Sequence, residues 1–230
     1  DYWGRRFTPL TTVTSSKVGS LSLGWTHRVV ATGRAGGGGT TAAVIKGTPV
    51  VAIGVLYVTI PDHVWALDAR DGRELWRFNT IPAPGEPGGD TWSGDAWKRG
   101  GGPIWVTGSY DPDLNLTYWG VGNPGPDWNG DGRPGDNLYT DSVIALDPDT
   151  GALKWHYQFT PHDEFDYDAT QVPVLPEVNY QGRQRSLACR HVPAVRDDRG
   201  EVARGPEGDQ RHARDADVAN HRDQHGSGRG

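Results

Sequence analysis

Three groups of residues in the middle of the chain have types and spacings suited to cofactor and metal chemistry. Trp105 follows three glycines, so an aromatic ring stands beside backbone that another group can approach closely. Asn123 lies in a Gly-Val-Gly-Asn-Pro turn, where its amide oxygen can face a cation. One histidine and four acids lie between His162 and Asp168. Such groups can hold a flat ring, a metal ion and a reacting proton.

The acid cluster favours a metal site over an isolated set of carboxylates. If the segment is extended, alternate side chains point to the same side. These are His162, Glu164, Asp166 and Asp168. Crowding of this kind raises carboxylate pKa values unless a cation neutralises the charge. We therefore expect a bound cation here.

Each of these residues also has a purely structural interpretation. Trp105 could be a core aromatic, Asn123 a turn former before proline, and Asp168 part of a solvated turn. The segment 127–132 resembles the start of an EF-hand loop. We reject an EF-hand because Leu138 occupies the twelfth position, which requires a bidentate glutamate, and no flanking helices are evident.

The composition indicates an all-β protein. The 230 residues include ten Trp, eight Tyr and 33 Gly but no Met, and no long stretch has helical apolar periodicity. A net charge of −6 argues against a nucleic-acid partner, because binding to the phosphate backbone requires a basic protein surface. No apolar run approaches the ~20 residues that span a bilayer. Cys189 is the only cysteine, so an internal disulfide is excluded.

The last fifty residues differ from the rest of the chain. All 22 aromatic residues (ten Trp, eight Tyr, four Phe) lie at or before Tyr180. We therefore divide the chain into a folded part, 1–183, and a tail, 184–230, which has too little apolar surface to offset the entropy of ordering and is predicted to be disordered. Its Arg, Ala, Gly, Asp and His composition is that of a GC-rich gene read out of frame. We expect a frame change near Arg183 to Ser186.

An internal repeat predicts the architecture. The sequence VWALDARDGRELW from Val64 recurs as VIALDPDTGALKW from Val143, about 80 residues later, or two units of the ~40-residue period of four-stranded propeller blades. Each copy reads as two strands joined by a tight turn, and we expect each turn Trp to pack against the neighbouring blade. Further strands are predicted over 48–53, 55–60, 104–110 and 114–120. The sequence indicates a β-propeller with about four blades rather than a β-sandwich.

The order of motifs resembles the quinoprotein alcohol dehydrogenases, eight-bladed propellers that use pyrroloquinoline quinone (PQQ). The resemblance extends from about Tyr2 to Arg185 with an internal gap, as in a truncated copy. The motifs that carry it are Asp95-Ala96-Trp97-Lys98, Gly100-Gly101-Gly102, Trp105, Tyr110-Asp111-Pro112, Gly120-Val121-Gly122-Asn123-Pro124, Arg133-Pro134-Gly135-Asp136-Asn137 and Thr160-Pro161-His162-Asp163-Glu164-Phe165-Asp166.

The resemblance implies roles for individual residues. Trp105 would be the floor on which the quinone stacks, with Gly101 and Gly102 allowing close approach. Asn123, Asp166 and Asp168 would be metal ligands. Asp166 would also be the catalytic base that takes the hydroxyl proton of a primary alcohol during hydride transfer to PQQ. Because Asp168 resembles the additional ligand of lanthanide-dependent members, we expect a lanthanide rather than calcium.

The resemblance also implies a periplasmic location, a small alcohol substrate and a cytochrome or quinone electron acceptor. The chain begins at Asp1 without a signal peptide. Between Trp76 and Thr91 it lacks the adjacent-cysteine disulfide, the quinone-binding arginine and the glutamate ligand of the family. We therefore expect weak or no activity from this chain. The alternatives are a non-catalytic propeller scaffold and a metal-binding module.

Overall fold

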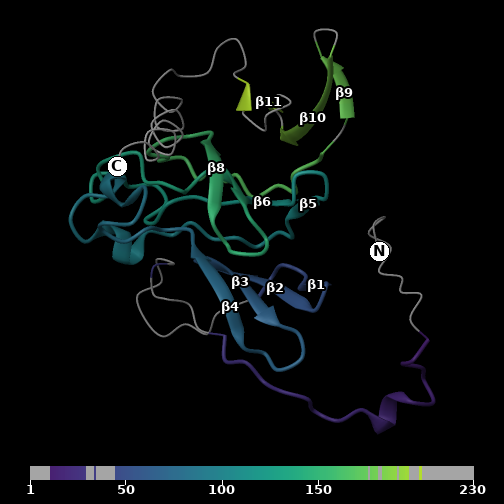
Figure 1. The fold of residues 1–230 in the computed structure, drawn as a ribbon. Helices are drawn as coiled ribbons and strands as arrows, with labels where there is room; N and C mark the ends of the chain where they lie inside the picture. The colour runs from purple at the N-terminus through teal and green to yellow at the C-terminus, as the bar shows by residue number, and fades with distance from the viewer. Residues whose placement is uncertain are drawn as a thin grey trace, which may run out of the picture.

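A computed structural model describes residues 11–29, 34 and 45–175, together with the backbone of four strands between 177 and 203. Its regular structure is almost entirely β, in three antiparallel sheets of four strands (Figure 1). The first sheet contains β1 (Val50–Ala52), β2 (Val55–Ile60), β3 (His63–Asp68) and β4 (Glu74–Asn79). The second contains β5 (Ser109–Asp111), β6 (Leu116–Gly120), β7 (Ser142–Leu146) and β8 (Leu153–Gln158). Consecutive strands are neighbours in both sheets, which gives the meander of a propeller blade.

The third sheet contains β9 (Glu177–Tyr180), β10 (Arg183–Arg190), β11 (Val192–Arg196) and β12 (Val202–Ala203). The described residues thus form three blade-like sheets, against the four or so that the sequence predicted. Strands β11 and β12, and all but the first residue of β10, lie in the segment 184–230 that we predicted to be disordered. Residues 204–230 lie outside the described part of the chain, so the frame change stays a prediction.

The sequence repeat is confirmed as a structural repeat. Strands β3 and β4 form the first copy, and β7 and β8 form the second. In both turns a glycine with a φ of +73° donates its N–H over 2.8 Å to the carbonyl of an aspartate: Gly72 to Asp68 and Gly151 to Asp147. Both hairpins also shift register at the same point, next to Leu67 and Leu146. The Asp-x-x-x-Gly spacing therefore specifies the turn in each blade.

Tryptophan side chains join successive blades. Trp76 on β4 donates its indole N–H over 2.9 Å to the carbonyl of Pro148, in the turn of the second blade. Trp25 binds the first blade in the same way, donating over 3.1 Å to the carbonyl of Ala69. The predicted packing of a turn Trp against the next blade is confirmed for Trp76. For Trp155, the equivalent position in the second blade, the side chains of the following sheet lie outside the described residues.

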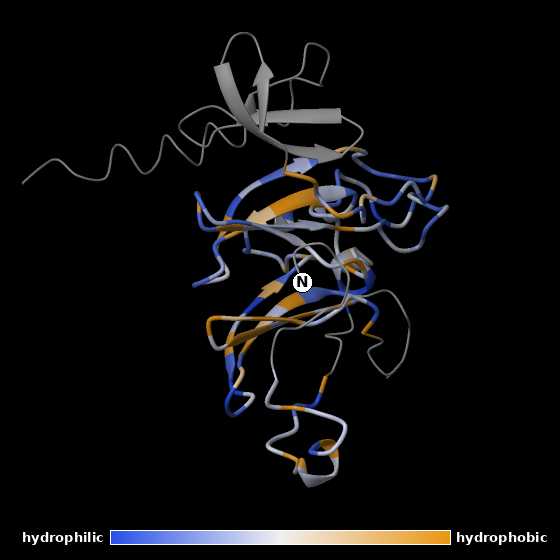
Figure 2. Cartoon of the chain, turned by 90° about the vertical axis from the view of Figure 1, so that its right-hand side faces the viewer, coloured by the Kyte–Doolittle hydropathy of each residue, from blue (hydrophilic) through white to orange (hydrophobic). Residues whose placement is uncertain are grey.

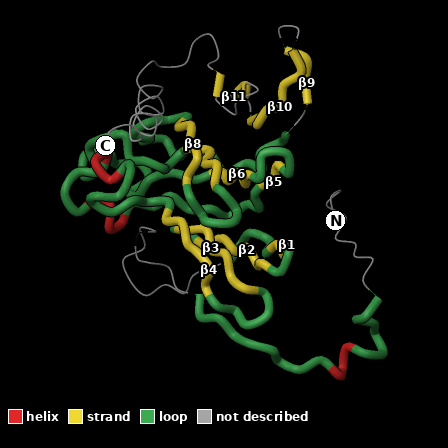
Figure 3. The backbone as a smooth tube through the Cα atoms, viewed as in Figure 1, coloured by secondary structure: helices red, strands yellow, loops and turns green. Residues whose placement is uncertain are grey.

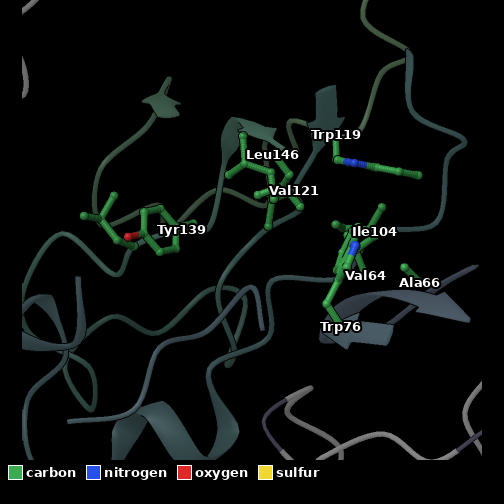
Figure 4. Packing of buried hydrophobic residues seen from close by; sticks show 10 residues of the cluster. Val64, Ala66, Trp76, Ile104, Trp119, Val121, Tyr139 and Leu146 are labelled. Carbon is green, nitrogen blue, oxygen red and sulfur yellow. The ribbon is translucent and has the colours of Figure 1, made fainter. Parts of the chain in front are cut away.

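The main hydrophobic core lies between the first two blades (Figure 4). Its buried members come from both sheets and from the loops between them: Val64, Ala66, Trp76, Ile104, Trp119, Val121, Leu138, Tyr139, Ile144 and Leu146. Figure 2 shows that hydrophobic residues, in orange, concentrate on the strands of these sheets. Burial of large aromatic and branched side chains thus fixes one blade against the other.

Three of the predicted strands extend beyond those of the structure: 48, 49 and 53 lie outside β1, 104–108 precede β5, and 114 and 115 precede β6. Residues 104–108 were predicted as strand, but β5 begins only at Ser109. In this segment Gly108 packs directly against Tyr118 and Trp119 of β6, and Ile104 enters the core. Thr48 also precedes its strand, since its N–H donates to the Thr107 hydroxyl over 3.1 Å.

Long loops carry the residues of interest. They connect β4 to β5, β6 to β7 and β8 to β9, and they gather at one end of the first two sheets with the short 3-10 helices Gly89–Thr91 and Ala96–Arg99 (Figure 3). A third 3-10 helix, Val18–Ser20, lies near the N-terminus. Among the described residues no helix is long and apolar enough to cross a membrane.

Candidate functional site

Trp105 and the loop that carries the acid cluster, residues 162–170 (the acid loop), both contact Gly122. A Cβ added to Gly122 would lie 2.8 Å from Cζ3 of Trp105 and 2.9 Å from Oδ1 of Asp168. The backbone N–H of Asn123 donates to that same Oδ1 over 3.1 Å. The structure therefore brings together three of the residues predicted from sequence, Trp105, Asn123 and Asp168, and only a glycine fits between them.

The glycine run lies beside the Asn123 turn. Gly102 donates its N–H to the carbonyl of Asn123 over 2.9 Å, and Gly101 forms an isolated antiparallel bridge with Pro124. Both glycines have positive φ, +81° for Gly101 and +62° for Gly102. A Cβ on Gly101 would come within 2.8 Å of the Asn123 carbonyl oxygen. The glycines are thus required for the close approach of two backbone segments.

The Asn123 side chain has a defined orientation. Its amide nitrogen donates to the Asp127 carboxylate over 2.8 Å and to the Pro124 carbonyl over 3.2 Å. Both partners only accept hydrogen bonds, so the nitrogen must face them. The amide oxygen is then the remaining polar atom of the side chain, and it is available as a ligand.

The prediction that the acid cluster is extended, with its alternate side chains on one side, is wrong. His162, Asp166 and Asp168 have φ values of +51°, +62° and +50°, so the segment bends repeatedly. The buried carboxylate of Asp163 causes part of this bending, because it accepts the N–H groups of Phe165 and Tyr167 over 3.0 Å each.

The bends divide the cluster between two locations. Glu164 accepts the N–H of Gly130 over 3.0 Å and lies 3.8 Å from the imidazole of His162. These two side chains therefore face the loop around Gly130. Asp168 instead faces Asn123 and Trp105. In the described part of the chain, no three His, Cys, Asp or Glu side chains come together as a metal site.

The surroundings of the two remaining acids, Asp166 and Asp168, raise the pKa of both. Partial burial raises the pKa of the Asp166 carboxyl, and the nearby charges of Asp127 and Asp163 raise it further. Burial also raises the pKa of Asp168, where the N–H of Asn123 opposes the shift and the charge of Asp166 adds to it. Asp166 and Asp168 thus interact with each other, and a cation between them would relieve the repulsion.

A cavity of about 530 Å³ adjoins the site. Its walls come from the glycine run and from the segment after Asn123: Gly101, Pro103, Asn123, Gly125, Pro126, Asp127, Trp128 and Asn129. Trp105 and Asp166 are not among these residues. Asn123 is therefore the predicted ligand that borders both the cavity and the contact between Trp105 and Asp168.

Sequence reasoning missed two residues of this region. Asp127 was considered only as part of an EF-hand-like loop, yet it orients Asn123. Arg133 was recognised only as part of a family motif and had no predicted role, yet its side chain is fully buried beneath the site. Neither position has a periodic or motif signal of its own, and one partner of Arg133, the Asp163 carbonyl, lies thirty residues away.

A comparison with protein families identifies the chain. Residues 1–82 and 63–190 match the family model described as PQQ, glucose/ethanol/alcohol dehydrogenase, β-propeller domain. Residues 63–82 belong to both matches. This overlap fits a chain in which one repeat of the family is followed directly by a later one, as the predicted internal gap requires.

Relatives agree with this match. The chain is 53% identical over 154 residues to the quinoprotein alcohol dehydrogenase PedH of Pseudomonas putida, covering 60% of this chain and 25% of that protein. It is 38% identical over 165 residues to a lanthanide-dependent methanol dehydrogenase of Methylorubrum extorquens, covering 64% and 27% respectively.

A solved structure titled europium-containing methanol dehydrogenase superposes with a TM-score of 0.62 at 31% identity, covering 70% of this chain and 33% of that one. The chain thus spans about a quarter to a third of the length of these relatives. The repeat, the stacked blades and the family match agree, and the chain belongs to the PQQ β-propeller family of glucose, ethanol and alcohol dehydrogenases.

Proposed function

We propose that this chain is part of an oxidoreductase that oxidises a primary alcohol with PQQ and a metal ion. The observation that carries the proposal is the meeting of Trp105, Asn123 and Asp168 around Gly122. An aromatic platform beside an amide and a carboxylate is what a flat anionic cofactor bound to a cation requires.

The residues present fit a hard cation. The amide oxygen of Asn123 and the carboxylates of Asp166 and Asp168 are oxygen donors of the kind that calcium and lanthanide ions bind. The raised pKa values of both carboxylates are consistent with this assignment, since they are shifted in the direction that a nearby positive charge would reverse. The second carboxylate, Asp168, favours a trivalent lanthanide over calcium.

The residues also fit a flat ring. Trp105 is half-buried, with its six-membered ring against Gly122, so part of its surface remains for stacking. Stacking of an electron-poor ring contributes ~0.5–1.5 kcal/mol beyond the buried area. Gly101 and Gly102 keep the adjoining backbone free of side chains.

We assign the proton transfer to Asp166. When bound, PQQ supplies an electrophilic carbon that accepts hydride. The Asp166 carboxylate takes the hydroxyl proton of the alcohol, so that the developing charge on the oxygen is neutralised as the C–H bond breaks. Asn123 and Asp168 hold the cation, and Trp105 orients the ring.

Family membership supports a cytochrome or quinone as electron acceptor and a periplasmic location. The family's adjacent-cysteine disulfide, quinone-binding arginine and glutamate ligand remain without counterparts in the sequence between Trp76 and Thr91. For this reason the chain binds its cofactor from one side and has weak or no dehydrogenase activity.

Binding is therefore the decisive test. The chain is titrated with PQQ in the presence of lanthanum or calcium, and tryptophan fluorescence and dye-linked alcohol oxidation are recorded. We expect metal-dependent quenching by PQQ that is lost in Trp105→Ala and kept in Trp97→Ala, whose indole packs on Arg34. Metal uptake without quinone uptake would indicate a metal-binding module. Uptake of neither would overturn the proposal and leave a scaffold.

A further inference from the structure

Arg133 is a fully buried cation whose hydrogen bonds go to neutral acceptors. Its side chain has an exposed fraction of 0%, and its charge interacts with four surrounding carboxylates, those of Asp163, Glu164, Asp141 and Asp127. The guanidinium donates to the carbonyls of Pro126, Asp127 and Asp163 and, over 2.9 Å, to the amide oxygen of Asn137. Burying a charge is unfavourable unless hydrogen bonds and nearby opposite charge stabilise it, and the Arg133 guanidinium has both.

The acceptors come from opposite sides of the site. Pro126 and Asp127 line the cavity beside Asn123, and the Asp127 carboxylate orients the Asn123 amide. Asp163 lies near the start of the acid loop. Its own carboxylate accepts the N–H groups of Phe165 and Tyr167 and so bends the loop on both sides of Asp166. One rigid guanidinium thus fixes both segments at once, which the planar five-donor group can do and a single ammonium cannot.

Arg133 is itself held in place. Asn137, fully buried, returns a hydrogen bond from its amide nitrogen to the Arg133 carbonyl over 2.9 Å, and it contacts the Thr91 carbonyl over 3.4 Å. The backbone N–H of Arg133 donates to the carbonyl of Gly130 over 2.9 Å. The guanidinium therefore has little freedom to follow either segment if the segments separate.

We propose that Arg133 is a positioning residue that fixes the 122–130 segment and the 162–170 loop relative to one another. Arg133 would thereby also set the distance between the proposed cation ligands, because Asn123 lies in one segment and Asp166 and Asp168 lie in the other. This effect on cation binding rests on the proposed function. The mechanical coupling of the two segments does not depend on it.

Hydrogen exchange of the whole chain without metal tests the coupling. In the wild type, the amides of Asn123, Phe165 and Tyr167 should open as one unit, with the same dependence on urea. Arg133→Lys keeps the charge but not the fork, and we expect exchange to rise at least tenfold in both segments while strands β3 and β7 are unchanged. Arg77→Lys, at an arginine on β4 paired with Glu74, is the control and should leave both segments as they are.

Terbium binding, followed by luminescence sensitised by tryptophan, gives a second readout. We expect Arg133→Lys to weaken terbium binding at least tenfold with little change in the melting temperature. If the wild type binds no terbium, the proposed function fails, whereas the exchange result still decides the role of Arg133. Independent opening of the two segments in the wild type would overturn our inference, as would unchanged protection in Arg133→Lys. The wild-type measurement applies even if the variant does not fold.

Discussion

Trp76 of one blade lies directly against Gly151 of the next. A Cβ added to Gly151 would come within 2.5 Å of Cε3 of the indole, and the indole N–H donates to the adjacent Pro148 carbonyl. The same arrangement joins Trp25 to Gly72, where an added Cβ would also lie 2.5 Å from Cε3. Glycine in each turn thus serves both the backbone conformation and the contact between neighbouring elements.

Gly151→Ala should therefore destabilise the chain by more than its backbone strain. A positive φ costs a non-glycine residue roughly 1–2 kcal/mol, and overpacking against Trp76 adds roughly 1–3 kcal/mol. Urea denaturation followed by tryptophan fluorescence measures the loss. Gly54→Ala is the matched control, since its φ is +77° but no atom lies within 4 Å of an added Cβ. Equal losses in the two variants would show that the Trp76 contact contributes nothing.

Gly122→Ala should impair the site while leaving the fold largely intact. The new methyl group would push Trp105 and Asp168 apart, so we expect at least a tenfold loss of PQQ and lanthanide binding, measured by fluorescence quenching and terbium luminescence. Gly132→Ala, where an added Cβ meets open space, should bind like the wild type. Wild-type binding by Gly122→Ala would exclude the contact between Trp105 and Asp168 as part of the site.

Asp127→Asn should weaken lanthanide binding by about tenfold, the lower end of the range for residues that orient a metal ligand. An asparagine at this position can accept or donate, so the Asn123 amide is no longer held with its oxygen free. Terbium titration measures the effect. Asp131→Asn changes the same charge on an exposed part of the same loop and is the control. If both variants lose affinity equally, the effect of Asp127 is long-range electrostatics rather than orientation.

The blades were predictable from the sequence because their determinants are local. The Asp-x-x-x-Gly turn and the alternating strands around it lie within one repeat, so the β3–β4 and β7–β8 hairpins follow from the pattern alone. Even the contact of Trp76 with the next blade followed from the repeat, since equivalent positions in a propeller have equivalent neighbours.

The acid loop and Arg133 were not predictable in the same way. Three residues of the loop take positive φ where the Asp163 carboxylate accepts two following N–H groups and Glu164 binds distant Gly130. In sequence, Arg133 looks like any surface charge. Its burial depends on carbonyl groups brought together from positions up to thirty residues away. Long-range contacts of this kind leave no periodicity or spacing to read.

Tyr139 should make the stability of the chain depend on alkaline pH. Burial raises the pKa of its phenol to about 12, with smaller contributions from the charges of Asp90 and Glu86. The folded state therefore holds this proton more tightly than the unfolded state, whose pKa is about 10. The resulting stability is fully present below pH 10 and is lost as the pH rises through 12, by a total on the order of 3 kcal/mol.

Tyr139→Phe separates this effect from general alkaline denaturation. The variant should be less stable at neutral pH by about 1 kcal/mol, because it loses the hydrogen bond from the phenol to the Pro87 carbonyl. Between pH 10 and 12, however, its free energy of unfolding should fall less steeply than that of the wild type, as measured by urea denaturation at each pH. Tyr110→Phe, at a tyrosine that is 50% exposed, should keep the wild-type decline. Parallel curves for Tyr139→Phe and the wild type would mean that the buried phenol does not carry the pH dependence.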